Sequence, residues 1–320
     1  MQDHQQLFQD QINSWPLATQ NYHELSHVLT KEFIFDNFRI KLQHNPNRII
    51  SSSANIDKNV IQKRECFLCR ENRPEMQKSD SFDSGFEILV NPYPVFPMHF
   101  TIASTKHQPQ RIQGQFQTLL DLAQRLNDCV VFYNGPRCGA SAPDHLHFQA
   151  GNKGLLPIEC DFSDWNKFHL SPLITSKNFQ IHKFENFLRN GWMIEGTNTS
   201  ELITTFEIIY NVLVSAFKEQ DEEPMLNIVC WFEKEKWIYL VFPRKAHRPN
   251  CYFRKDGTGL LISPASVEMG GLFIAARLED FNKIDKKDII EIYDDVSVSN
   301  DEIEKLSELV KSKLQEKGNP

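Results

Sequence analysis

Several features are missing from this chain of 320 residues. No stretch approaches the roughly 18 consecutive apolar residues that a membrane-spanning helix needs. The first residues, MQDHQQLFQDQ, have neither a basic segment followed by an apolar stretch nor a small-residue cleavage site, so no signal peptide is expected. These absences predict a cytoplasmic protein that has no membrane partner.

An excess of positive charge is missing as well. The chain has 35 basic and 42 acidic side chains, a formal net charge of −7 and an isoelectric point near 5.9. A protein that binds a nucleic-acid duplex needs a concentrated basic surface to neutralise the phosphates. We therefore expect no nucleic-acid partner. A small phosphorylated ligand remains compatible, because a few local cations and backbone amides are enough to hold one.

A disulfide framework is not expected either. The seven cysteines are odd in number and scattered, and only Cys66 and Cys69 lie close together. Their spacing in CFLC suits two corners of a zinc tetrahedron, although free thiols or a redox pair remain the alternative. No second such pair occurs later in the sequence, so further ligands would come from elsewhere in the chain. The candidates are His107, at a strand end, and His145 or His147.

The order of the predicted elements indicates an α+β fold. A polar link separates a mixed N-terminal region, with a helix near 22–32 and a strand near 38–43, from the rest of the chain. Strands are then expected at 86–90, 98–104 and 129–134, with a helix over 113–128 between the second and third. Beyond residue 190, a helix at 200–220, a hairpin at 227–243 and an amphipathic helix at 300–317 are expected. This order describes antiparallel sheets with packed helices.

Two segments hint at an internal duplication. HFTIASTKHQPQ, at 99–110, and IYLVFPRKAHRPN, at 238–250, both run from an apolar strand into a basic residue, a histidine and a proline. We expect an N-terminal extension at 1–60, a first half at 61–190 that carries the candidate motifs, and a second half at 191–320 that ends in the amphipathic helix.

The stretch DHLHFQA, at 144–150, alternates polar and apolar residues. In a strand, successive side chains point to opposite faces, so His145, His147 and Gln149 would share one side. The apolar side suits a core, whereas the polar side is either an exposed sheet edge or a functional surface. The preceding loop, GPRCGASAP, offers glycines, a serine hydroxyl and backbone amides that can hold phosphate oxygens.

These groups together suit nucleotidyl transfer. If a metal takes one strand histidine, the other is free, and a neutral imidazole is a good nucleophile at pH 7. Gln149 could donate a hydrogen bond to a non-bridging phosphate oxygen as charge shifts in the transition state. In the second half, Arg244, His247 and Arg248 either reach substrate phosphates or form a solvated basic turn. His99 is expected to be an ordinary core or surface residue.

The same residues carry a family resemblance. CFLC with a following asparagine, a histidine after a strand, a glycine-serine loop and His-x-His-x-Gln, in this order, resemble the galactose-1-phosphate uridylyltransferase branch of the histidine triad superfamily. HLHFQA…LPIE is closer to the GDP-hexose phosphorylases of that superfamily, and the string from CFLC to HLHFQAG is similar to a bacterial domain family of unassigned specificity. The resemblance is strong from about 36 to 160 and extends to about 295.

The chain also departs from both patterns. The uridylyltransferases have proline where Leu146 and Phe148 stand, and many of the phosphorylases lack the cysteine pair. The resemblance thus leaves the substrate open.

The resemblance implies specific roles for these residues. His147 would be the nucleophile that takes a nucleoside monophosphate, and Gln149 would contact the phosphate. Asn134, Gly139 and Ser141 would lie near the donor phosphates. A structural zinc ion would be held by Cys66, Cys69, His107 and His145. The fold would be two histidine-triad-like half-units in one chain.

The implied function is a nucleotidyltransferase or phosphorylase. It would act on a nucleoside diphosphate sugar or a dinucleotide through a covalent histidine intermediate, with phosphate or a sugar 1-phosphate as acceptor. Related uridylyltransferases are dimers, so a homodimer is a further prediction. The alternatives are a zinc-stabilised nucleotide-binding protein without turnover, and a nucleotide hydrolase in which water is the acceptor.

Overall fold

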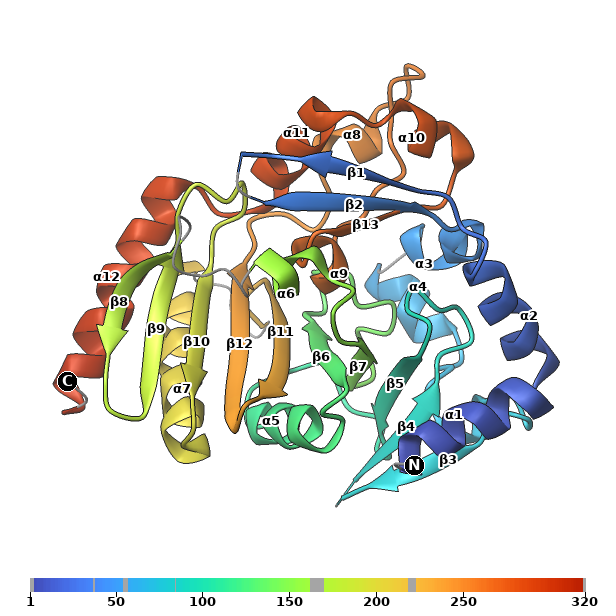
Figure 1. Ribbon diagram of the computed structural model, residues 1–320, viewed down its shortest axis with the longest axis horizontal. Helices are drawn as coiled ribbons and strands as arrows, with labels where there is room; N and C mark the ends of the chain where they lie inside the picture. Colours follow the sequence, from blue (N-terminus) through green and yellow to red (C-terminus); the bar gives the residue numbers. More distant parts are fainter. Residues whose placement is uncertain are drawn as a thin grey trace.

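A ten-stranded antiparallel sheet runs through the centre of the molecule (Figure 1). The computed structural model describes residues 3–36, 38–53, 57–83, 85–161, 170–217 and 223–318. Along the sheet the strand order is β3-β4-β5-β7-β6-β11-β12-β10-β9-β8. The strands are β3 (Ser79–Phe82), β4 (Phe86–Val90), β5 (His99–Ser104), β6 (Cys129–Asn134), β7 (His147–Asn152), β8 (Leu170–Thr175), β9 (Phe179–Phe184), β10 (Trp192–Gly196), β11 (Leu226–Glu233) and β12 (Lys236–Pro243).

The sheet consists of two topologically equivalent halves. Each half is three strands, a helix and two strands in chain order: β3, β4, β5, α5 (Phe116–Arg125), β6 and β7, then β8, β9, β10, α7 (Thr199–Phe217), β11 and β12. They meet where β6 pairs with β11, with Asn227 opposite Asn134. The expected duplication is present in the topology, but the sequence match behind it was wrong. Strand β5 corresponds to β10, and β12 corresponds to β7.

This topology also bears on the boundaries of the two halves. Strands β8 and β9 belong to the second half by strand order, although both precede residue 190. We therefore propose a division between the end of β7 and the start of β8, between residues 152 and 170, in place of the expected 190.

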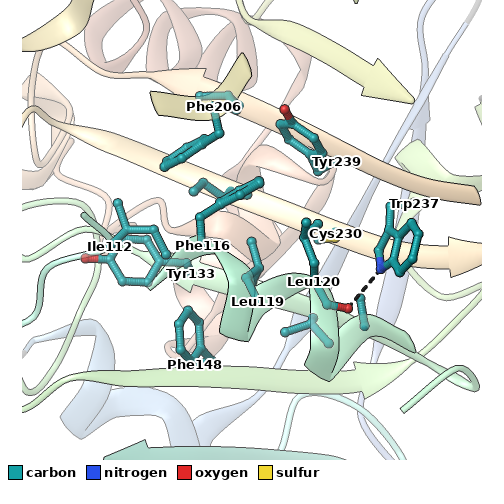
Figure 2. Close-up of a cluster of buried hydrophobic side chains, with 14 of the residues drawn as sticks. Ile112, Phe116, Leu119, Leu120, Tyr133, Phe148, Phe206, Cys230, Trp237 and Tyr239 are labelled. Carbon is teal, nitrogen blue, oxygen red and sulfur yellow. Dashed lines mark hydrogen bonds between the residues drawn. The ribbon is translucent and has the colours of Figure 1, made fainter. Parts of the chain in front are cut away.

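One face of the sheet is covered by α5, α7, α12 (Asn300–Glu316) and α1 (Asp3–Ser14). Figure 2 shows part of this core, where Phe116 stacks on Phe206 with ring centroids 3.9 Å apart. Trp237 belongs to the same core, and its indole N–H donates to the Leu120 carbonyl at 2.9 Å. Phe148 of β7 is fully buried in the same core. The alternating pattern of β7 is thus explained, since its apolar side faces this helical layer.

The other face is covered by a smaller sheet built from both ends of the chain. Strand β2 (Arg39–His44) pairs antiparallel with β1 (Thr30–Ile34) and parallel with β13 (Leu272–Ala275). In Figure 1 this layer lies above the large sheet, and the helices at 250–253, 278–283 and 286–296 lie above it. The remaining helices are α2 (Pro16–Leu25), α3 (Ile49–Ser52), α4 (Lys58–Lys63), α6 (Pro157–Asp161), α8 (Asn250–Phe253), α9 (Ser266–Met269), α10 (Leu278–Lys283) and α11 (Lys286–Val296), with short 3-10 turns η1 (Pro46–Arg48) and η2 (Arg70–Asn72).

Helix α7 is, among the described residues, the one helix whose length and hydropathy would allow it to cross a membrane. Its side chains Phe206 and Leu213 are buried in the core between the large sheet and the other helices. Its apolar composition therefore has a structural explanation within the fold.

Candidate active site and metal centre

Two cysteines and two histidines converge at one end of β5 and β7. Cys66 and Cys69 precede η2, His107 follows β5, and His145 lies two residues before β7. The candidate ligand atoms of these four residues all lie within 4.8 Å of one another. His145 Nδ1 is 3.3 Å from Cys66 Sγ and 3.5 Å from Cys69 Sγ. His107 Nδ1 is 3.3 Å from Cys69 Sγ.

These distances suit a tetrahedral ion. With zinc–sulfur bonds near 2.3 Å and zinc–nitrogen bonds near 2.0–2.1 Å, the sulfur-to-nitrogen edge of a tetrahedron is about 3.6 Å. The hydrogen bond that His145 makes outside the cluster leaves its Nδ1 atom free to bind a metal ion. His145 Nε2–H donates to the Ser104 carbonyl at 2.7 Å, so its Nδ1 lone pair faces the sulfurs. His107 Nε2 lies 3.9 Å from Asp144 Oδ2, and Asp144 Oδ1 accepts a hydrogen bond from Arg64 at 2.8 Å.

His147 occupies the first position of β7 and is buried. Its Nδ1–H donates to the His145 carbonyl at 2.8 Å, which leaves the lone pair on Nε2. No described residue forms a hydrogen bond with Nε2. Burial lowers the pKa of His147 to about 4, so the ring is neutral at pH 7. The geometry and charge state together are those of a nitrogen nucleophile.

Gln149 lies on the same face of β7, two residues further on. Its Oε1 accepts a hydrogen bond from His99 Nε2 at 3.0 Å. No described residue contacts its amide nitrogen within hydrogen-bond distance. The carboxamide is therefore anchored through its oxygen and keeps its two N–H donors for a ligand.

The glycine-bearing loop before β7 packs against the second half. Asn134 Oδ1 accepts from Asn227 Nδ2 at 3.0 Å and from the Ser266 N–H at 2.8 Å. Gly139 has φ +97°, and a Cβ there would lie 2.3 Å from the Ala265 Cβ. The Ser141 carbonyl accepts from Arg64 at 3.2 Å. Asn134 and Gly139 thus help to hold the loop against the second half of the chain. The contacts of Asn134, Gly139 and Ser141 with donor phosphates remain a prediction.

Comparisons with known proteins agree with this architecture. Residues 7–152 match a family described as "Domain of unknown function (DUF4922)", and residues 169–317 match the "GDPGP1-like, C-terminal domain". The structure of yeast Ap4A phosphorylase Apa2 in complex with AMP is similar, with 17% identity and a TM-score of 0.58 over 93% of this chain and 97% of that chain. This chain has a duplicated histidine triad fold.

The match to a GDPGP1-like domain confirms the expected resemblance to the branch that contains the GDP-hexose phosphorylases. A second structure of yeast Apa2 is 14% identical, with a TM-score of 0.58 over 93% of this chain and 98% of that one. A uridylyltransferase mutant is 13% identical, with a TM-score of 0.41 over 78% of this chain and 94% of that one. No curated protein sequence matches the chain.

In this histidine triad fold only the first half carries the triad-like strand. A row of paired positions runs across the sheet from Gln149 through Phe132 and Val229 to Leu240. Strand β12, which corresponds to β7, therefore presents Ile238, Leu240 and Phe242 on the face where β7 presents His147 and Gln149. Within the described residues, each chain thus has a single site of this kind.

The basic segment after β12 has a structural role that its composition does not reveal. Arg244 is buried, and its guanidinium donates to Asn227 Oδ1 at 2.5 Å and to the Pro264 carbonyl at 3.1 Å. It also donates to the carbonyls of Val296, Ala246 and His247. The hypothesis that Arg244 reaches substrate phosphates is therefore wrong, because its donors are used to join β11, β12 and the C-terminal segment.

Three residues near the site were not found from the sequence. Gln110 accepts from the His147 N–H at 2.8 Å and donates to the carbonyls of His147 and Asn134 at 3.0 and 2.9 Å. His99 holds Gln149. Arg48, from η1, donates to the Tyr93 carbonyl at 2.9 Å, and its positive charge contributes to a lowered pKa of His99. For Gln110 the clustering of polar residues in TKHQPQ was available as a signal, whereas no comparable cluster surrounds His99.

Proposed function

We propose that this chain is a nucleotidyltransferase or phosphorylase that uses His147 as its nucleophile. The observation that carries the proposal is the hydrogen bond from His147 Nδ1–H to the His145 carbonyl, which leaves the lone pair on Nε2, on the face of β7 that also carries Gln149. The match to a GDPGP1-like domain and the shared fold with an Ap4A phosphorylase support this class of reaction. The donor would be a nucleoside diphosphate sugar or a dinucleotide.

The proposed reaction has two steps. His147 Nε2 attacks the α-phosphorus of the donor, the N–P bond forms, and the P–O bond to the leaving phosphate breaks, with the electron pair going to that oxygen. The ring becomes positively charged, and the His145 carbonyl stabilises it through the Nδ1–H bond. An oxygen of the acceptor phosphate or sugar 1-phosphate then attacks the phosphorus, and the N–P electron pair returns to Nε2.

Gln149 and the loop would act on the phosphate. The free N–H donors of Gln149 would bind a non-bridging oxygen, whose charge grows as the reaction proceeds. The proposed contacts of Asn134, Gly139 and Ser141 with the donor phosphates would come from the remaining polar groups of the loop, since Asn134 Oδ1 is already engaged.

We also propose that Cys66, Cys69, His107 and His145 hold a structural zinc ion. Two sulfur and two nitrogen ligands would saturate zinc, so the ion would supply rigidity and leave no position open for substrate. Its effect on the reaction would be to fix His145, whose carbonyl orients the His147 ring. A cytoplasmic location and a homodimer remain predictions of the same proposal.

The test is a turnover assay with GDP-, UDP- and ADP-sugars and Ap4A as donors, run without acceptor, with inorganic phosphate and with a sugar 1-phosphate. We expect one donor class to be cleaved only when one of these two acceptors is present. His147→Ala should lower the rate at least about 10³-fold, as expected when a nucleophile is removed. His27→Ala, at an exposed histidine, is the matched control and should keep full activity.

The alternatives give different results in the same assay. Cleavage that proceeds equally well without either acceptor would favour the hydrolase. Nucleotide binding that His147→Ala leaves intact, with no cleavage of any donor by the wild type, would contradict the proposal and favour a binding protein without turnover.

A further inference from the structure

We infer that His99 is a positioning residue that fixes which end of the Gln149 carboxamide faces the substrate phosphate. The inference rests on the proposed function, because it concerns how Gln149 would serve the reaction at His147. His99 itself would touch neither the substrate nor His147.

The hydrogen bonds of the His99 ring define its tautomer. Nδ1 lies 3.2 Å from the backbone nitrogen of Val95, which can only donate, so Nδ1 must be the acceptor. The ring proton is therefore on Nε2, which donates to Gln149 Oε1 at 3.0 Å. A chain of two hydrogen bonds thus runs from the Val95 backbone through His99 to the oxygen of Gln149.

The surroundings hold the ring in this state. His99 is only 1% exposed, and its ring packs against Phe96 and Phe132, with centroids 5.5 and 6.0 Å away. Burial and the charge of Arg48 lower the pKa of His99 to about 3. The ring is consequently neutral at physiological pH and has one donor and one acceptor, both of them used.

The orientation matters because a carboxamide has two chemically opposite ends. If the Gln149 carboxamide turned by 180°, its oxygen would replace the N–H donors on the side that faces away from His99. An oxygen lone pair repels an anionic phosphate oxygen, whereas an N–H group stabilises it. The anchored Oε1 excludes the turned state, because His99 Nε2–H cannot pair with the amide nitrogen.

Two substitutions separate this role from simple packing. In His99→Asn, the side-chain oxygen can still accept from Val95, but the side chain is too short to reach Gln149. In His99→Gln, the terminal amide nitrogen can donate to Gln149 as Nε2 does. The measured quantities are the single-turnover rate of nucleotidyl transfer to the enzyme, the Kd for the nucleoside monophosphate and the Tm.

The expected pattern is specific. Gln149→Ala should slow transfer about 10²-fold, the usual effect of losing one transition-state donor. His99→Asn should slow it at least about ten-fold with little change in Kd, and His99→Gln should recover most of the rate. The double variant His99→Asn/Gln149→Ala should be no slower than Gln149→Ala within about two-fold, because the two residues act as one unit.

Two results would overturn the inference. A double variant that is slower by the product of the single effects would show that His99 acts independently of Gln149. Nitrogen-15 NMR of the His99 ring that finds the proton on Nδ1 would contradict the tautomer without any assay of activity. A wild type that is never nucleotidylated would instead remove the proposed function, and this inference with it.

Discussion

Replacement of Gln110 by alanine tests how the structure holds His147. Gln110 is 1% exposed and bridges three backbone groups, namely the N–H and carbonyl of His147 and the carbonyl of Asn134. In Gln110→Ala these three groups stay buried and lose a partner. Each such loss costs about 1–2 kcal/mol, so we expect the free energy of unfolding to fall by about 3–6 kcal/mol. This is a large share of the stability of an ordinary domain.

The assay is guanidinium denaturation followed by fluorescence, together with the rate of nucleotidyl transfer. Gln108→Ala is the matched control, because Gln108 is half-buried and makes a single side-chain bond, to Ser104 at 3.0 Å. The control should lose no more than about 1 kcal/mol. If Gln110→Ala were as stable as the control, the bridge between β6 and β7 would not exist in solution, and the placement of His147 would need another explanation.

The metal cluster, a buried carboxyl and the glycine loop provide three further predictions. The purified protein should contain one zinc ion per chain by elemental mass spectrometry; Cys66→Ser should lose it, whereas Cys230→Ser, in the apolar core, should keep it. Burial raises the pKa of Glu223 from 4.5 to about 7, so the protonated carboxyl stabilises the fold at low pH and this contribution is lost as the pH rises through 7. The stability gained by Glu223→Gln over the wild type, measured by denaturant titration, should therefore grow by about 2.5 kcal/mol between about pH 5 and pH 8; an unchanged difference would contradict the raised pKa. Gly139→Ala should lower the Tm more than Gly154→Ala, since both have positive φ but only the first would place a Cβ against the second half; equal losses would show that the loop does not pack as described.

The elements that the sequence predicted well are those whose pattern reflects local burial. Strand β6 has the expected bounds, Cys129–Asn134, and the β11–β12 hairpin and helices α7 and α12 lie where expected. The helix predicted at 22–32 was wrong, because α2 ends at Leu25 and β1 begins at Thr30. Strands β8 to β10 were missed, since β8 and β9 are only partly buried and β10 is short.

The site residues also fall into those that the sequence predicted and those that it did not. The four candidate metal ligands meet as expected, because cysteine and histidine are recognisable as ligands by residue type. Gln110 and His99 are not recognisable in this way, since their roles depend on hydrogen bonds to residues 37 and 50 positions away. Arg244 was misread for the opposite reason, because a basic residue in a polar turn gave no sign that the fold buries it. The sequence predicts which side chains have the chemistry to bind a metal. It does not predict which side chains hold the site together through tertiary hydrogen bonds.

The most direct test of the central claim is intact-mass spectrometry of the protein after brief incubation with each donor and no acceptor. The account predicts the addition of one nucleoside monophosphate per chain, because β12 has no histidine at the positions that correspond to β7. Peptide mapping should place the added mass on His147, and His147→Ala should show none. Two results would contradict a reaction through this histidine. One is a wild type that stays unmodified with a donor that it turns over when acceptor is present, and the other is a modification that persists in His147→Ala.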